Sequence, residues 1–307
     1  MDKKAHIYIG DSCDLGCRFC TNKKQAHERK RFISSALLKK KLKKYAEKKY
    51  DVVDFLGGEV TLYPRIEKII RYASDLGYKR INLISHGLKF ADPDFVKNIA
   101  SAGNVRFCIS VESHKEKTED FLISVQGGFR KKIKGLYNLI LLRKQGVIRE
   151  KIFLMTVINK LNYKTMPETV FFYFRNFGIK DFRFRFIMPV GKASVHFKLL
   201  VPTYTQVLPY IARLMELAGK LNLNISYDGI PSCILRNIKG YKDFISEAID
   251  RSEEDTGMAD PENKDKRRRK KTRKCRKCVY NMQCTGLWKK YLEIHGKKEF
   301  KPVLQAV

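Results

Sequence analysis

The feature that most constrains the fold is a repeated alternation of short apolar runs with longer amphipathic segments. The apolar runs are typical of parallel strands that are covered on both faces. Helical periodicity fills the intervals, and repeated strand–helix units favour a parallel sheet with right-handed crossovers. The expected strands are 5–10, 52–56, 80–85, 105–111, 152–157 and 182–187, and the expected helices are 34–49, 64–76, 94–101, 129–145 and 164–177.

Six such units are fewer than the eight of a closed barrel, so the pattern predicts an α/β fold with a partial, TIM-like (β/α)6 barrel. After Gly191 the rhythm changes, with one further helix near 204–221 and one short strand near 223–228. We therefore expect residues 1–200 to form the barrel and residues 201–307 to form a small C-terminal extension.

The chain is strongly basic. Its 307 residues carry 63 Lys and Arg against 32 Asp and Glu, a formal net charge of +31. Residues 262–277 alone hold eleven Lys and Arg against two acids. The highly charged segment 250–274, which contains Gly257 and Pro261, is predicted to be a mobile linker. Heat-adapted surfaces usually balance Lys with Glu, so attraction to a polyanion stays open beside a general feature of the host proteome.

The composition also bears on location and on the cysteines. No run approaches about 18 uninterrupted apolar residues and the first residues contain no apolar signal core, so we expect a cytoplasmic protein without a membrane span. In that compartment eight cysteines argue against disulfides, and seven of them fall in two groups, which indicates metal binding. The eighth, Cys108, lies in an apolar run and is expected to be a buried core thiol.

The first cysteine group has the spacing CxxxCxxC and consists of Cys13, Cys17 and Cys20. It follows the first expected strand, so it lies where strand–helix folds place their chemistry. Thiolates bind iron–sulfur clusters, and three thiolates on four irons leave one iron open for catalysis. A zinc site is the alternative, although zinc usually takes four ligands in paired CxxC spacing.

A second motif, Gly57-Gly58-Glu59, follows the second expected strand. The two glycines allow a ligand to approach the backbone closely, and the carboxylate offers an acceptor for an ammonium group. The two motifs, at the ends of neighbouring strands, together resemble those of the radical S-adenosylmethionine (SAM) superfamily. The resemblance covers about residues 5–195.

The resemblance implies that Cys13, Cys17 and Cys20 hold a [4Fe–4S] cluster whose open iron binds SAM. In that family a Gly-Gly-Glu stretch holds the methionyl amino group, and the aromatic residue before the last cysteine packs near the adenine. A polar residue at the end of strand four also contacts SAM, and the backbone after strand six faces the adenine. The residues expected to contact SAM are Phe19, Gly57, Gly58, Glu59, Ser110 and Met188.

Three further stretches match the family less closely. Glu112 stands where many members have Asp, and the stretch 189–193 (PVGKA) corresponds to Pro-x-Gly-Arg-Ala. Residues 85–87 (SHG) correspond to Thr-Asn-Gly, which places Ser85 and His86 near the mouth of the active site. For His86 a plain loop histidine is favoured over a catalytic one. The implied chemistry is reductive cleavage of SAM to a 5′-deoxyadenosyl radical that removes a hydrogen atom from an unreactive C–H bond. A reductant such as ferredoxin or flavodoxin supplies the electron, and no catalytic acid or base can be assigned.

The second cysteine group, Cys275, Cys278 and Cys284, resembles part of the SPASM extension of many radical SAM enzymes. That extension carries seven cysteines and two auxiliary clusters, whereas here Trp288 occupies one expected cysteine position. Together with Cys233, the group suffices for one fully ligated auxiliary [4Fe–4S] cluster, as in the reduced twitch form. A zinc knuckle on the same four cysteines is the alternative.

The sequence leaves the substrate open among three classes. Relatives with this extension often modify peptides, which favours a peptide substrate and a separate leader-binding partner, because the first strand begins too early for a preceding peptide-recognition domain. The charge of +31 motivates RNA modification, although no RNA-binding module is visible. Rearrangement of a small anionic metabolite is the third class. A zinc-stabilised nucleic-acid-binding protein is the non-enzyme alternative.

Overall fold

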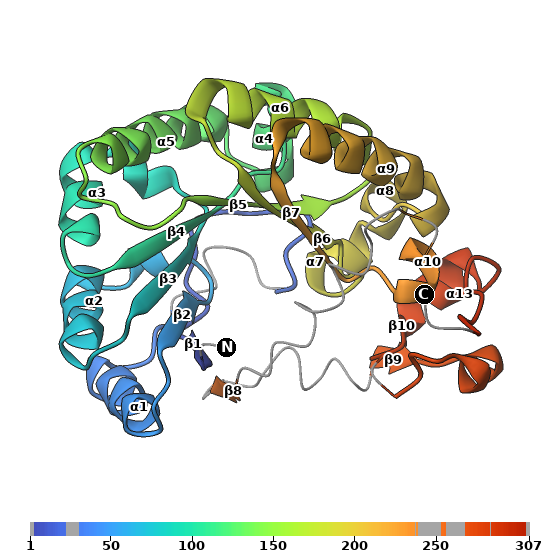
Figure 1. Ribbon diagram of the computed structural model, residues 1–307, viewed down its shortest axis with the longest axis horizontal. Coiled ribbons are helices and arrows are strands. Elements are labelled where there is room, and N and C mark those ends of the chain that lie inside the picture. Colours follow the sequence, from blue (N-terminus) through green and yellow to red (C-terminus); the bar gives the residue numbers. More distant parts are fainter. Residues whose placement is uncertain are drawn as a thin grey trace.

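The computed structural model describes residues 3–22, 31–236, 238, 268–282 and 284–304, and residues 253–255 as backbone. Within this part of the chain, eight parallel strands form one curved sheet in the order β7-β6-β5-β4-β3-β2-β1-β8. Helices cover its outer side, so the strands line a half-barrel and the predicted partial TIM-like α/β fold is confirmed (Figure 1). The strands are β1 (Lys4–Tyr8), β2 (Val52–Leu56), β3 (Arg80–Ser85), β4 (Val105–Ser110), β5 (Phe153–Ile158), β6 (Asp181–Phe186), β7 (Asn224–Asp228) and β8 (Glu253–Asp255).

In the part of the chain that the structure describes, helices cover the outer face of the sheet alone, whereas the apolar strands suggested helices on both faces. Burial alternates along β4, where Phe107 and Ile109 are at most 1% exposed beneath the helices. Cys108 points the other way and is half-buried on the concave face. Cys108 was expected to be a buried core thiol, and this expectation is wrong. Successive side chains of a strand face opposite sides, so Cys108 lies on the face opposite to Phe107 and Ile109. Burial still raises the pKa of Cys108 to about 12.

The covering helices follow from their apolar spacing. In α2 the buried residues are Ile66, Ile69, Ile70 and Ala73, which lie on one helical face, and each isoleucine contributes roughly 1.5–3 kcal/mol by burial. The helices around the sheet are α1 (Ser35–Glu47), α2 (Ile66–Asp75), α3 (Pro93–Ala100), α4 (Glu116–Ile123), α5 (Gly128–Lys144), α6 (Met166–Phe177), α7 (Gly191–Val195), α8 (Phe197–Leu200) and α9 (Tyr204–Leu221), with 3-10 turns η2 (Val60–Leu62), η3 (Leu88–Ala91) and η4 (Tyr163–Thr165).

The strand–helix rhythm continues beyond the six predicted units. The strand β7, which we expected in the C-terminal extension, pairs with β6, and the ion pair between Arg185 Nε and Asp228 Oδ2 (2.7 Å) links the two. At the opposite edge β8 pairs with β1. Both β8 and β9 (Arg269–Lys270) fall within the predicted linker 250–274, most of which lies outside the described residues. The boundary near residue 200 stays a prediction.

The C-terminal segment packs against the far end of the half-barrel. We call residues 268–304 the cysteine lobe. Its Tyr291 hydroxyl accepts the backbone N–H of Tyr204 at 2.9 Å, and Glu299 Oε1 accepts that of Thr205 at 2.7 Å, so the lobe satisfies the first N–H groups of α9. Besides β9, the lobe contains η6 (Arg273–Lys277), β10 (Leu287–Trp288) and α13 (Lys289–His295), and it packs beside α10 (Ser232–Leu235). Among the described helices, none is long and apolar enough to span a membrane.

Candidate active site

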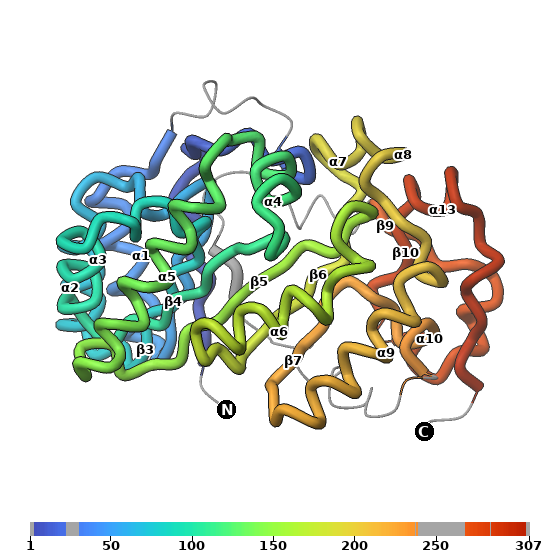
Figure 2. The backbone as a smooth tube through the Cα atoms, turned by 90° about the horizontal axis from the view of Figure 1, so that it is seen from above, coloured from blue at the N-terminus to red at the C-terminus, as the bar shows by residue number. Residues whose placement is uncertain are grey.

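The first cysteine group lies on the loop after β1, as predicted. Figure 2 shows this segment at the same end of the half-barrel as α4, α7 and α8. Cys13, Cys17 and Cys20 are half-buried. The loop turns tightly, because Cys20 N–H donates to Cys17 O (3.2 Å) and Leu15 N–H donates to Cys13 Sγ (3.4 Å). A small apolar cluster of Leu15, Leu88, Ile123 and Val125 packs against Cys13 and Cys17.

The electrostatics of this loop fit a large metal group. Burial, and then the neighbouring Cys20, raises the pKa of the Cys17 thiol well above its usual range. A thiolate there needs a compensating cation, which a metal centre supplies. Among the described residues, the group with three ligand atoms within 4.8 Å of one another is Cys13, Asp14 and His86. The cysteine loop thus places a thiol, a carboxylate and an imidazole side by side, all three of which are metal-ligand types.

The Gly57-Gly58 pair lets the chain approach itself. A Cβ on Gly57 would lie 2.4 Å from Gly10 O, and one on Gly58 would lie 2.1 Å from Ser12 O. In this arrangement Gly58 N–H donates to Gly10 O (2.8 Å) and Glu59 N–H donates to Ser12 O (2.7 Å). The glycines therefore fasten the end of β2 to the cysteine loop. Their predicted contact with SAM stays a prediction.

We expect Gly58→Ala to lower the free energy of unfolding by about 2–3 kcal/mol, because the new methyl group would overlap the backbone of the cysteine loop. Urea unfolding followed by circular dichroism measures this. Gly219→Ala is the matched control, since nothing lies within 4 Å of its Cβ and alanine should stabilise α9 by about 0.5–1 kcal/mol. Equal stabilities for the Gly58 and Gly219 variants would contradict the close approach.

Glu59 is 1% exposed, and its carboxylate accepts four hydrogen bonds. Its Oε1 accepts the backbone N–H of Thr61 (3.0 Å), the Thr61 hydroxyl (2.6 Å) and the Ser85 hydroxyl (2.6 Å). Its Oε2 accepts the backbone N–H of His86 at 2.8 Å. The carboxylate is thus held rigidly between the ends of β2 and β3, beside the cysteine loop.

His86 connects this carboxylate to the cysteine loop. Leu88 N–H donates to Nδ1 (3.2 Å), which assigns the ring proton to Nε2. Nε2 lies 2.7 Å from Asp14 Oδ1 and 3.3 Å from Glu59 Oε2. Partial burial opposes ionisation of Asp14, but the hydrogen bond from His86 lowers its pKa overall. The plain loop histidine favoured by the sequence is therefore a buried bridge between Asp14 of the CxxxCxxC motif and Glu59.

The end of β4 is held by a buried ion pair. Lys132 and Glu119 are at most 1% exposed and lie 2.5 Å apart. Lys132 Nζ also donates to Ser110 O (2.8 Å), while Glu119 Oε2 accepts the backbone N–H groups of Glu112 (2.6 Å) and Ser113 (2.8 Å). Two helices, α4 and α5, thereby fix the strand end that carries the predicted SAM contact Ser110.

Glu112 joins the same buried network. Its Oε2 accepts the backbone N–H of Val157 at 2.9 Å and ties β4 to β5. Burial, and then the charge of Glu119, raises the pKa of Glu112 to about 8. Although burial works against the cation, Glu119 and Glu112 raise the pKa of Lys132. The cation stays charged and interacts electrostatically with Cys17.

The stretch after β6 packs directly on the cysteine loop. Gly191 has φ +58°, and a Cβ there would lie 2.1 Å from Thr21 O. Lys192 N–H donates to Cys20 O (2.9 Å), and its Nζ donates to Gly16 O (3.3 Å). The PVGKA stretch therefore packs against the third cysteine of the loop.

The two predicted adenine neighbours border this region. Phe19, inside the CxxxCxxC motif, is partly buried against the core. Met188 is also partly buried, and its carbonyl accepts Val190 N–H at 2.8 Å. Both belong to segments that meet at the cysteine loop, while their contact with adenine stays a prediction.

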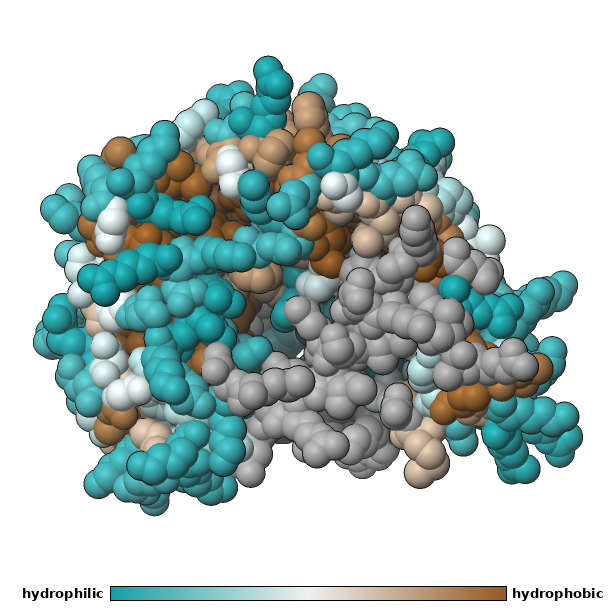
Figure 3. All heavy atoms as spheres, in the orientation of Figure 1, coloured by the Kyte–Doolittle hydropathy of each residue, from teal (hydrophilic) through white to brown (hydrophobic). Residues whose placement is uncertain are grey.

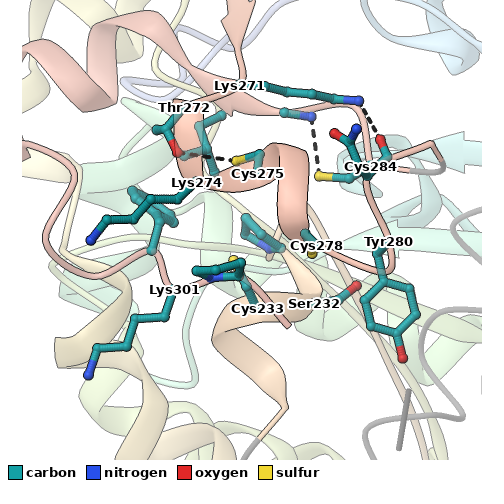
Figure 4. A pocket seen from close by; sticks show the side chains of 16 residues that line it. Ser232, Cys233, Lys271, Thr272, Lys274, Cys275, Cys278, Tyr280, Cys284 and Lys301 are labelled. Carbon is teal, nitrogen blue, oxygen red and sulfur yellow. Dashed lines mark hydrogen bonds between the residues drawn. The ribbon is translucent and has the colours of Figure 1, made fainter. Parts of the chain in front are cut away.

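The structure brings the four C-terminal cysteines to one pocket. Figure 4 shows Cys233, Cys275, Cys278 and Cys284 lining it, although Cys233 comes from α10, distant in sequence. Burial, and then the thiols of Cys284, Cys278 and Cys275, raises the pKa of Cys233 to about 12. Gly286 N–H donates to Cys284 Sγ (3.3 Å). A set of four converging, half-buried thiols is a donor set suited to a metal or an iron–sulfur cluster.

Sequence reasoning missed several residues of the site. Asp14 lies inside the CxxxCxxC motif, but its pairing with His86 depends on β3. Lys132 and Glu119 stand on amphipathic helices, where charged residues usually indicate a solvated face. Their burial follows from the packing of α4 and α5 under the end of β4, and no local pattern signals it.

Comparisons with known proteins agree with this arrangement. The model of the radical SAM superfamily matches residues 7–173. The AdoMet-dependent heme synthase of Oleidesulfovibrio alaskensis is 25% identical over 192 residues, which are 62% of this chain and 44% of that protein. The chain thus spans less than half of this curated relative.

Solved structures share the fold. SuiB of Streptococcus suis bound to precursor peptide SuiA superposes with a TM-score of 0.61 at 17% identity, covering 76% of this chain and 50% of SuiB. Native anSMEcpe with bound AdoMet and Kp18Cys peptide gives a TM-score of 0.57 at 17% identity, covering 73% of this chain and 64% of that one. The family match extends over more than half of the chain and includes both motifs at the ends of β1 and β2. The chain therefore belongs to the radical SAM superfamily.

Proposed function

We propose that this chain is a radical SAM enzyme that oxidises or rearranges a C–H bond of a peptide or protein substrate. The observation that carries the proposal is the junction at which three cysteines, the Gly-Gly-Glu stretch and the PVGKA stretch meet. The fold alone would not suffice, because one fold hosts many activities.

Members of this family use a [4Fe–4S] cluster and SAM. Cys13, Cys17 and Cys20 would hold the cluster, since all three thiols are half-buried on one loop and apolar side chains pack against Cys13 and Cys17. When bound, the cluster and SAM supply a 5′-deoxyadenosyl radical that removes a hydrogen atom from the substrate. The apolar cluster beside the thiols would exclude water from this chemistry.

The chain's own residues position SAM. Glu59 would accept hydrogen bonds from the methionyl ammonium group, because its carboxylate is fixed at the ends of β2 and β3. Asp14 and His86 hold that carboxylate in place from the cysteine loop. Ser110, Met188 and Phe19 would contact the remainder of SAM, as would the backbone of Gly57 and Gly58.

We expect Glu59→Gln to weaken SAM binding at least about tenfold, which corresponds to about 1.4 kcal/mol. The substitution removes the negative charge. Both carboxylate oxygens accept from donors, so the NH2 group of the amide would face a donor at either position. Equilibrium dialysis with labelled SAM measures the affinity. Glu47→Gln, on the exposed side of α1, is the matched control. An affinity within twofold of the parent protein would rule out the ammonium contact.

The comparisons support a peptide substrate, because SuiB and anSMEcpe, which share the fold, have been solved with bound peptides. RNA is a second candidate, favoured only by the charge of +31.

We propose an auxiliary [4Fe–4S] cluster at Cys233, Cys275, Cys278 and Cys284, supported by their convergence on one pocket.

Anaerobic purification and cluster reconstitution test the proposal. We expect about eight irons and eight sulfides per chain, as for two [4Fe–4S] clusters, and formation of 5′-deoxyadenosine with dithionite and SAM. About four irons with SAM cleavage would retain the enzyme and exclude the auxiliary cluster. Zinc without SAM cleavage would overturn the proposal. If SAM is cleaved, peptides encoded beside the enzyme are screened by mass spectrometry for loss of hydrogen.

A further inference from the structure

The cysteine lobe carries an unusual concentration of positive charge. Residues 268–304 contain thirteen Lys and Arg against two Glu. Both acids are engaged inside the lobe or at its base, since Glu293 lies 3.7 Å from Lys290 Nζ and Glu299 binds Thr205 and Tyr291. Twelve of the thirteen cations are exposed: Arg268, Lys270, Lys271, Arg273, Lys274, Arg276, Lys277, Lys289, Lys290, Lys297, Lys298 and Lys301.

Part of this charge surrounds an open hollow of about 340 Å³ beside the cysteine pocket. Lys271, Arg273 and Arg276 line it together with Thr272 and Asn281, and none of the lining residues is acidic. Guanidinium groups bind carboxylates through two parallel hydrogen bonds, and an ammonium group adds a point charge. The hollow is therefore suited to carboxylate side chains.

Apolar side chains are exposed on the same lobe. Met282 is 92% exposed, Leu304 65% and Val279 46%. Val279 N–H donates to Val303 O (2.9 Å), which places Val279 and Leu304 on neighbouring segments. Figure 3 shows hydrophilic side chains flanking an apolar patch over this part of the molecule. Exposed Met and Arg side chains are enriched at protein–protein interfaces, and this lobe exposes Met282 beside several arginines.

The aromatic residues of the lobe argue against a single-stranded nucleic acid. Trp288, Tyr291 and Phe300 are at most 4% exposed, and Tyr280 is half-buried at the cysteine pocket. The Arg269 guanidinium lies 4.0 Å from the centre of the Trp288 ring and covers it. The lobe thus offers no row of exposed rings on which bases could stack.

A continuous series of contacts connects the lobe to the active site. The His295 ring of α13 lies 5.1 Å from that of Phe197 in α8, and its Nε2 donates to Val201 O at 3.2 Å. The adjoining α7 packs on the cysteine loop through Lys192 and Cys20. The lobe that carries the hollow is therefore connected, through α13, to helices that adjoin the cysteine loop.

We propose that the cysteine lobe docks an acidic segment of the polypeptide substrate, with interspersed apolar side chains. Carboxylates would enter the hollow formed by Lys271, Arg273 and Arg276, and apolar side chains would contact Met282, Val279 and Leu304. This proposal rests on the proposed peptide-modifying function and adds the charge and place of substrate recognition.

Fluorescence anisotropy with the anaerobically reconstituted full chain tests the proposal. The probe is a fluorescein-labelled dodecapeptide of alternating Glu and Leu, and its comparison peptide has Gln in place of Glu. We expect the double variant Arg273→Glu/Arg276→Glu to bind the acidic probe at least about tenfold more weakly at low salt. The matched control is Lys40→Glu/Lys43→Glu on α1, at the other end of the half-barrel, which should change affinity less than about twofold because salt screens distant charges.

Three outcomes would overturn the proposal. Equal weakening by both double variants would show attraction to the overall charge. Equal affinities for the Glu and Gln peptides would show that the lobe does not recognise carboxylates. Tighter binding of bulk tRNA, lost in the lobe variant alone, would assign the surface to nucleic acid. The neutral variant Arg273→Gln/Arg276→Gln provides the same test if charge reversal prevents folding. No SAM cleavage is needed, so failure here is distinct from failure of the proposed enzyme.

Discussion

Cys17→Ala is expected to abolish formation of 5′-deoxyadenosine and to remove about four irons per chain. The loss should exceed the roughly 10–100-fold effects of residues that only orient metal ligands. Cys17 is the middle thiol of the loop and interacts electrostatically with both other thiols, so its removal leaves two ligands for the cluster. Iron analysis, the absorbance of the reconstituted protein and chromatography of the SAM products measure the effect.

Two controls locate that effect. Cys108→Ala should keep the iron content of the parent protein, because Cys108 lies on the concave face of β4, away from both cysteine groups in sequence. Cys233→Ala should lower iron at the C-terminal site alone. If Cys17→Ala still cleaves SAM, the assignment of the N-terminal cysteines to the catalytic cluster is wrong.

Lys132→Met is expected to lower the free energy of unfolding by about 3–5 kcal/mol, because it leaves the buried Glu119 carboxylate without its counter-charge. It also removes the donor that holds Ser110 O at the end of β4. Urea unfolding of the apoprotein measures the loss without interference from metal binding.

A second variant separates the charge from the hydrogen bonds. In Lys132→Met/Glu119→Gln the amide oxygen can still accept the backbone N–H groups of Glu112 and Ser113, while the unpaired charge is gone. We expect the double variant to recover most of the lost stability. A double variant no more stable than Lys132→Met would mean that the hydrogen bond to Ser110, and not the charge, dominates.

The parts of this molecule that could be predicted from sequence are those whose signal is local. The CxxxCxxC motif sets its own loop, and the apolar face of α2 follows from residues three and four apart. The strands β1 to β6 were recognisable because each is a short apolar run between helices. The sequence could not show that helices cover only one face of these strands. Phe107 and Cys108 differ little in hydropathy, although they face opposite sides of the sheet.

The rest depended on contacts between distant segments. The pairing of β7 with β6 extends the sheet beyond the predicted six strands, since backbone hydrogen bonds at a sheet edge leave no mark in the side-chain pattern. Cys233 was grouped with the C-terminal cysteines only by the need for a fourth ligand, and its position in the pocket comes from α10. The ion pair of Lys132 with Glu119 joins two helices whose charges looked like surface charges.

The fastening of the PVGKA stretch to Cys20 sets an order of assembly. The hydrogen bond from Lys192 N–H to Cys20 O closes a loop that includes every strand from β2 to β6. During synthesis the cysteine loop leaves the ribosome first, yet the surface that supports it is made some 170 residues later. The surface that would enclose the proposed cluster is therefore complete only after β6 and the PVGKA stretch have been made.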